Sequence, residues 1–168
     1  RYYGSGFHFL SAPIEIVINF LIEINYITPN SKPILLKHPS VFLFFVLSGI
    51  YFKKILTIII GNKNYSSICA ILYLLFPYLL GHSFFNIKDI PFLSVWLVCT
   101  YFFISFVNCH FKEKKIKIKN IFIFGLLTAY LFSIIISGIL ILLQYLIFFI
   151  FMINISKDKF SSFINIYY

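Results

Sequence analysis

The sequence predicts an all-α membrane protein, a multi-pass bundle of about five transmembrane helices with an amphipathic helix at the outer membrane surface. Of the 168 residues, 61% are hydrophobic and only 11% are charged, and the mean hydropathy is +0.96. A soluble domain of this length has too little interior to hide so many apolar side chains. The apolar residues also gather in runs that approach the ~20 residues needed to cross a bilayer. Lipid is therefore the expected solvent for most of the chain.

Residues 1–40 form the first of two regions and are expected to end an outer loop. Within them, Glu15, Asn19 and Glu23 follow one another at intervals of four, which on a helix makes one polar stripe. Two carboxylates inside a membrane span would be costly. The pattern therefore predicts an amphipathic helix that lies at the membrane surface, followed by a loop over the Pro-rich segment 28–33.

Residues 41–168 form the second region, the transmembrane part of the chain. Its apolar runs predict spans at about 41–58, 65–80, 90–108, 121–136 and 139–155. The last two come from one continuous apolar stretch that is too long for a single crossing at ~1.5 Å per residue. Ser137 and Gly138 lie near the middle of this stretch. A tight turn there would produce a hairpin of two short spans.

The lysines predict the orientation of the bundle. Most of them lie in the segments 53–63, 112–119 and 157–159, and an even number of predicted crossings separates each segment from the next. The positive-inside rule then places all three segments in the cytoplasm and the loop 81–92 outside. The net charge of +9 is therefore expected to set topology. Membrane lipids are expected partners, and nucleic acid is not.

The loop 81–92 is the densest cluster of polar and ionisable side chains between two long apolar runs. It contains His82, Asn86, Lys88 and Asp89, which makes it the candidate site. Structural roles compete with this interpretation: Asp89 could cap the third span with Pro91 in its first turn, and Lys88 could extend to lipid headgroups. His82 could form hydrogen bonds at the membrane interface. No metal-binding spacing of histidines or cysteines is present, so the residues predict no metal site.

The segment from Pro77 to Phe92 resembles a known family. It is similar to the P-x-x-x-G-H-x-F-x-N-x-K-D-x-P-F segment of bacterial membrane glycosyltransferases of the GT-C type. These are relatives of the dolichyl-phosphate-mannose protein mannosyltransferases and of the aminoarabinose lipid A transferases. The N-terminal residues Arg1 to Gly4 likewise resemble the R-Y-Y-G of that family, near the end of its first outer loop.

The resemblance implies an inverting transfer at the outer face of the bacterial inner membrane. The donor would be a polyprenyl-phosphate-linked sugar, and the acceptor a lipid, a glycan or a protein. By the same resemblance, Asp89 would be a supporting acid, Lys88 and Arg1 would bind the phosphate, and His82 and Asn86 would shape the loop. The main base would lie upstream of Arg1, so the chain would be a fragment. The resemblance implies no particular cofactor, and it leaves a divalent metal open.

Two other function classes compete with the enzyme. One is a transporter or flippase, in which Lys88 and Asp89 would form a gating pair; the other is a structural membrane subunit without catalysis. A transporter predicts inverted repeats and charges near the middle of its spans. The charges here gather at loop ends and no repeat is visible, which favours the enzyme.

Overall fold

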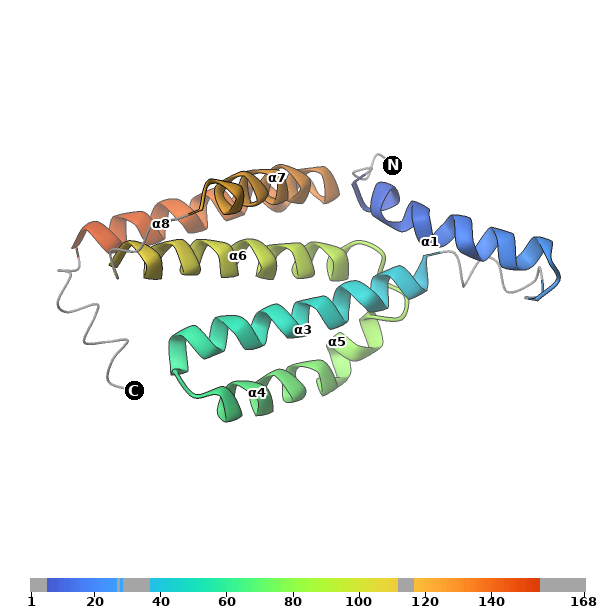
Figure 1. Cartoon of the computed structure of the whole chain (residues 1–168), viewed down its shortest axis with the longest axis horizontal. Helices are drawn as coiled ribbons and strands as arrows, with labels where there is room; N and C mark the ends of the chain where they lie inside the picture. Colours follow the sequence, from blue (N-terminus) through green and yellow to red (C-terminus); the bar gives the residue numbers. More distant parts are fainter. Residues whose placement is uncertain (1–5, 27, 29–36, 112–116, 155–168) are drawn as a thin grey trace.

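The computed structural model describes residues 6–26, 28, 37–111 and 117–154, and its regular elements are all helices (Figure 1). This confirms the all-α prediction. The elements are α1 (Gly6–Glu23), α3 (His38–Ile60), α4 (Lys63–Leu75), α5 (Pro77–His82), α6 (Asp89–Phe111), α7 (Ile118–Ile134), the 3₁₀ helix η2 (Ile136–Ile139) and α8 (Leu140–Asn154).

Helices α3 and α6 form the centre of the bundle and lie side by side, running in the same direction (Figure 1). Among the described residues, these two helices are long and apolar enough to cross a membrane. Each contains 23 residues, and at ~1.5 Å per residue each is longer than the ~30 Å core of a bilayer. The predicted spans 41–58 and 90–108 fall within them.

The predicted span 65–80 is not one continuous helix. Helix α4 ends at Leu75, and Pro77 begins the short helix α5. Proline lacks an N–H donor and disfavours helical geometry in the residue before it. That residue, Phe76, is accordingly extended, with φ −62° and ψ 117°. The chain therefore bends before it enters the loop that carries the candidate site.

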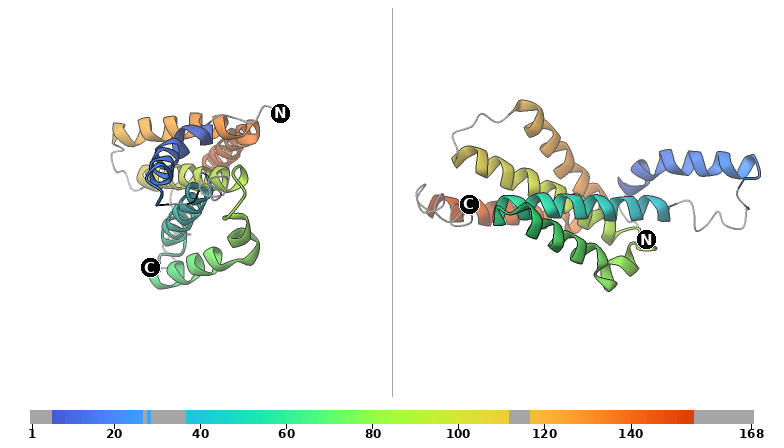
Figure 2. Two further views of the ribbon diagram at one scale, coloured as in Figure 1. Left: turned by 90° about the vertical axis from the view of Figure 1, so that its right-hand side faces the viewer. Right: turned by 60° about the horizontal axis from the view of Figure 1, so that its bottom comes forward.

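The predicted hairpin turn lies close to its expected position. Helix α7 ends at Ile134, and η2 joins it to α8, which begins at Leu140. A Cβ atom on Gly138 would lie 2.9 Å from the carbonyl oxygen of Leu131, so this turn excludes a side chain at that position. The two helices diverge from the turn (Figure 2). With 17 and 15 residues, each is shorter than the ~20 residues of a typical span.

The interior of the bundle contains small side chains at close helix contacts. In the part of the chain that the structure describes, the buried polar residues are all serines: Ser11, Ser40, Ser48, Ser66, Ser83 and Ser94. The Ser94 hydroxyl, on α6, lies 2.7 Å from the carbonyl oxygen of Phe44 on α3. Small residues and hydroxyl bonds between helices are the usual means of packing helices in lipid.

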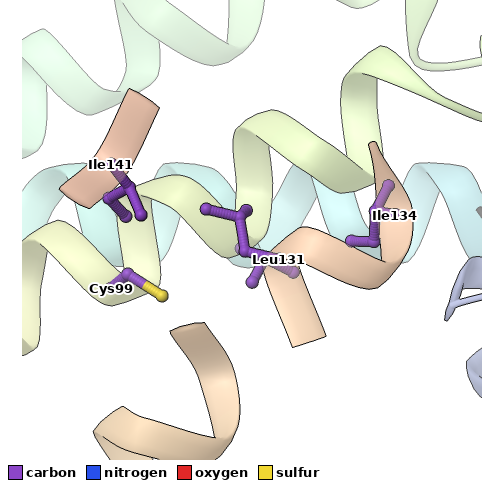
Figure 3. Close-up of a cluster of buried hydrophobic side chains, with 5 residues drawn as sticks. Cys99, Leu131, Ile134 and Ile141 are labelled. Atoms are coloured by element: carbon purple, nitrogen blue, oxygen red, sulfur yellow. The ribbon is translucent and has the colours of Figure 1, made fainter. Parts of the chain in front are cut away.

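A buried apolar cluster joins α6 to the last two helices. It consists of Val95, Cys99, Leu131, Ile134 and Ile141, and Figure 3 shows side chains from the three helices meeting there. The cluster keeps the end of α7 and the start of α8 against the central helix. It therefore fixes the hairpin relative to the rest of the bundle.

Large apolar side chains cover much of the outer surface. In the most apolar 18-residue stretch of each central helix, only 22% of α3 and 33% of α6 is buried. The core helix of a soluble protein is, by contrast, mostly buried. Exposed residues on α4 and α8 include Ile71, Leu72, Leu143 and Ile147. A bilayer would cover apolar surface of this extent, and a soluble monomer rarely exposes it.

Candidate functional site

The candidate site lies in the turn that joins α5 to α6. Backbone hydrogen bonds shape the chain directly after α5. The N–H groups of Phe85 and Asn86 both donate to the His82 carbonyl, at 3.2 and 2.8 Å. Ser83 is fully buried, and its hydroxyl donates to the Leu80 carbonyl at 2.6 Å. These bonds give the loop a defined conformation, so its polar side chains have fixed neighbours.

Asn86 is the residue around which the polar groups are arranged. Its Oδ1 atom accepts the backbone N–H groups of Lys88 and Asp89, at 3.2 and 2.9 Å. Its Nδ2 atom donates to Oδ2 of Asp89 at 2.8 Å. Asn86 therefore holds the turn that leads into α6 and accepts the N–H group of the first helical residue, and the interpretation that Asp89 is the cap residue is corrected. Asp89 is instead the first residue of the helix, where its negative charge interacts favourably with the positive end of the helix dipole.

His82 joins the same network from the last turn of α5. Its Nδ1 atom lies 3.1 Å from Nδ2 of Asn86. The ring packs against Tyr78 at a centroid distance of 4.4 Å and against Phe85 at 5.5 Å. His82 is half-buried as a result, while Tyr78 and Phe85 are exposed. Hydrogen bonds thus connect three of the predicted site residues: His82, Asn86 and Asp89.

Of the two predicted phosphate-binding residues, the structure describes only Lys88. Lys88 directly precedes α6, its side chain is half-buried, and its backbone N–H is held by Asn86. Arg1 lies outside the described residues. The proposed contact of both residues with a phosphate therefore stays a prediction.

The amphipathic segment and the candidate site lie at the same end of the bundle (Figure 1). Phe7 of α1 shares a buried apolar cluster with Val41, Phe45 and Ile90, the second residue of α6. Next to it, His8 accepts a hydrogen bond at Nδ1 from Lys37, with 2.9 Å between the nitrogens. The first turn of α1 is therefore held beside the start of α3 and the start of α6.

The turn between α3 and α4 carries lysines and lies away from the candidate site. The described lysines of the predicted cytoplasmic segments are Lys53, Lys54, Lys63, Lys117 and Lys119, and all are exposed. The turn between α3 and α4 lies at the end opposite the α5–α6 loop (Figure 1). One of these lysines, Lys54, lies over the rings of Tyr51 and Tyr101, 4.4 and 5.4 Å from their centroids, as expected for a basic residue beside interfacial aromatics.

The aromatic neighbours of His82 are the site feature that sequence reasoning missed. Tyr78 lies four residues before His82, and Phe85 lies three residues after it. Residues at these spacings share a face wherever the chain is helical or nearly so. Phe84 also stacks on Phe42 of α3, with 5.6 Å between centroids. The spacing around the histidine was the signal that would have found the first two.

The described groups limit the chemistry of the site. In the described ranges, no three His, Cys, Asp or Glu side chains lie together in a way that could hold a metal ion. The cluster offers one carboxylate, one imidazole and one amide, which can form hydrogen bonds to hydroxyl or phosphate oxygens and can transfer protons. Comparison of the chain with protein-family models, curated proteins and solved structures found no match.

Proposed function

We propose that this chain is part of an inverting GT-C glycosyltransferase, which moves a sugar from a polyprenyl phosphate to an acceptor on the outer membrane face. The supporting observation is the hydrogen-bonded cluster of His82, Asn86 and Asp89, within the segment that resembles this family. The cluster lies at the end of the bundle away from the α3–α4 turn and its lysines. An enzyme that uses a lipid-linked donor requires such a polar site at the membrane surface.

The proposed topology has five crossings of a bacterial inner membrane. Helices α3 and α6 would cross fully, and the bent pair α4–α5 and the shorter helices α7 and α8 would cross with local thinning of the bilayer. The lysine-bearing end would face the cytoplasm by the positive-inside rule. The α5–α6 loop and α1 would then lie at the outer surface, where the exposed apolar side chains of α1, such as Val17 and Phe20, would enter the lipid interface.

In the proposed reaction, a hydroxyl of the acceptor attacks the anomeric carbon of the donor sugar from the face opposite the phosphate. The carbon–oxygen bond to the phosphate breaks, and the lipid phosphate leaves with the bonding electrons. A base outside the described residues would take the hydroxyl proton, and Asp89 would support that step as a second carboxylate. Lys88 and Arg1 would stabilise the negative charge of the departing phosphate.

The decisive experiment replaces Asp89 by Asn in the full-length protein, reconstituted in proteoliposomes with a radiolabelled polyprenyl-phosphate sugar. Loss of a catalytic carboxylate lowers turnover by about 100-fold or more, while the amide of the new side chain keeps the volume. Glu113→Gln removes the same charge from the predicted cytoplasmic loop and is the control, with unchanged turnover expected. Normal transfer by Asp89→Asn would refute the proposed role.

A transporter or flippase is the second candidate, and the break between α4 and α5 is the observation that favours it. Discontinuous helices are common where a transporter binds its substrate. Translocation of a fluorescent prenyl phosphate across sealed vesicles, without sugar transfer, would favour this candidate. A protein that performs neither reaction would agree with a structural subunit.

A further inference from the structure

The orientation of the Asn86 amide is determined by its partners. Two backbone N–H groups, those of Lys88 and Asp89, point at the same side-chain atom. An N–H group requires an acceptor, and the only acceptor of an amide is its oxygen. Oδ1 must therefore face the start of α6, and Nδ2 must face the other way.

The amide nitrogen then decides which nitrogen of His82 carries the proton. Nδ2 has two N–H bonds: one is directed to Oδ2 of Asp89 at 2.8 Å and the other to Nδ1 of His82 at 3.1 Å. Because Nδ2 can only donate, Nδ1 of the histidine must accept. A neutral imidazole that accepts at Nδ1 carries its proton on Nε2.

We propose that Asn86 is a positioning residue that holds neutral His82 with its proton on Nε2, so that the imidazole donates a hydrogen bond to an anionic phosphate oxygen of a membrane-borne ligand. The identity of the ligand rests on the proposed function; the assignment of the proton does not. No described residue bonds to Nε2. The exposed rings of Tyr78 and Phe85 flank the imidazole, and they offer an apolar surface beside the donor.

The first test reads the proton position directly. The full chain, labelled with ¹⁵N-histidine and held in lipid nanodiscs, is studied by long-range ¹H–¹⁵N spectra at a pH where the imidazole is neutral. Loss of one set of signals in His82→Gln identifies the residue among the four histidines. We expect an unprotonated Nδ1 and a protonated Nε2. A proton on Nδ1 in the wild-type protein would overturn the inference.

The second test changes the donor while it keeps the helix cap. In Asn86→Asp, a carboxylate oxygen still accepts the two backbone N–H groups, since Asp and Asn cap helices about equally well. The other oxygen now faces both Nδ1 of His82 and the carboxylate of Asp89 as an acceptor, and a proton on Nδ1 offsets this negative charge. We expect Nδ1 to gain a proton, so that its ¹⁵N signal leaves the range of an unprotonated nitrogen. Persistence of an unprotonated Nδ1 would contradict the proposed role of Asn86.

The chain offers a matched control at another helix. Asn62 is the N-cap of α4, and its Oδ1 accepts the backbone N–H groups two and three residues on, those of Asn64 and Tyr65, at 2.9 and 3.3 Å, as Oδ1 of Asn86 does at Lys88 and Asp89. Asn62→Asp therefore makes the same chemical change at a cap for which no bond to a histidine is described, and we expect the His82 signals to stay in place. An equal change of the His82 signals in this variant would overturn the inference, because the effect would not come through Asn86.

A third test identifies the ligand. Polyprenyl phosphate in the nanodisc should shift the Nε2–H signal of His82, and inorganic phosphate at the same concentration should not. An equal response to both would overturn the membrane-borne source, and no response to either would overturn the donor role. The proposed function can be refuted independently of this inference. If the proton lies on Nε2 and the signal responds to the lipid, but the full-length protein transfers no sugar, only the enzymatic function is refuted.

Discussion

Two turns at opposite ends of the bundle use asparagine for the same backbone task but with different surroundings. At both, a side-chain oxygen accepts the backbone N–H groups two and three residues on, directly before α4 at Asn62 and in the turn that leads into α6 at Asn86. The amide of Asn62 has exposed neighbours, Lys63 among them. The amide of Asn86 also donates to His82 and Asp89. The comparison separates a cap that only starts a helix from one that also organises a polar site.

The largest expected effect is a change in the membrane orientation of the two turns. Replacement of Lys53, Lys54 and Lys63 by Gln removes the charges that are proposed to hold the Asn62 turn in the cytoplasm. We expect a mixture of orientations, whereas the parent protein should adopt one. The measurement is labelling of a cysteine introduced at Asn64, in a background without the native cysteines, by a reagent that does not cross the membrane. A cysteine that stays fully protected after the replacement would contradict the orientation.

The two caps should differ in their contribution to stability. Asn62→Ala should lower the free energy of unfolding by about 1 kcal/mol, the usual value of a cap. Asn86→Ala should lower it by about 2–3 kcal/mol, because the side-chain bonds to His82 and Asp89 are lost as well. Denaturation in mixed micelles, followed by circular dichroism, compares the two. Equal losses would show that the wider network adds nothing to the cap.

A third turn, at the same end as Asn86, tests how tightly the loops are packed. Gly138→Ala would place a methyl group 2.9 Å from the Leu131 carbonyl oxygen and should cost about 1–3 kcal/mol. Gly81→Ala, in α5, meets no atom within 4 Å and should stabilise the protein by about 0.5–1 kcal/mol through helix propensity. Thermal unfolding of both variants in the same detergent measures the difference. The same sign for both would contradict the described packing.

The smallest effect is expected at the contact between α1 and the start of α3. The hydrogen bond between Lys37 and His8 is exposed, so Lys37→Met should change stability by less than about 1 kcal/mol. The variant should leave the His82 signals unchanged, since no described contact joins the two histidines. A large loss of stability would show that α1 depends on this bond more than on the burial of Phe7.

The sequence by itself determined the helical class, the central helices and the location of the polar cluster. Apolar runs of sufficient length predict α3 and α6, and a tight turn near Gly138 follows from the length of the last apolar stretch. Proximity in sequence was enough to group His82, Asn86 and Asp89. These features depend on composition and on local spacing, which a chain carries without reference to its fold.

The tertiary structure decided which of these groups are partners. Both Asn86 and Asp89 are good capping residues, and only the path of the 83–88 turn selects Asn86. The hydrogen bond from the Tyr130 hydroxyl to the Gly6 carbonyl, at 3.0 Å, joins α7 to α1 across most of the chain. Such pairings depend on how distant helices pack, and apolar surfaces of similar composition can pack in many ways. Local spacing therefore predicts an element, whereas its partner is chosen by the shape of the surface that packs against it.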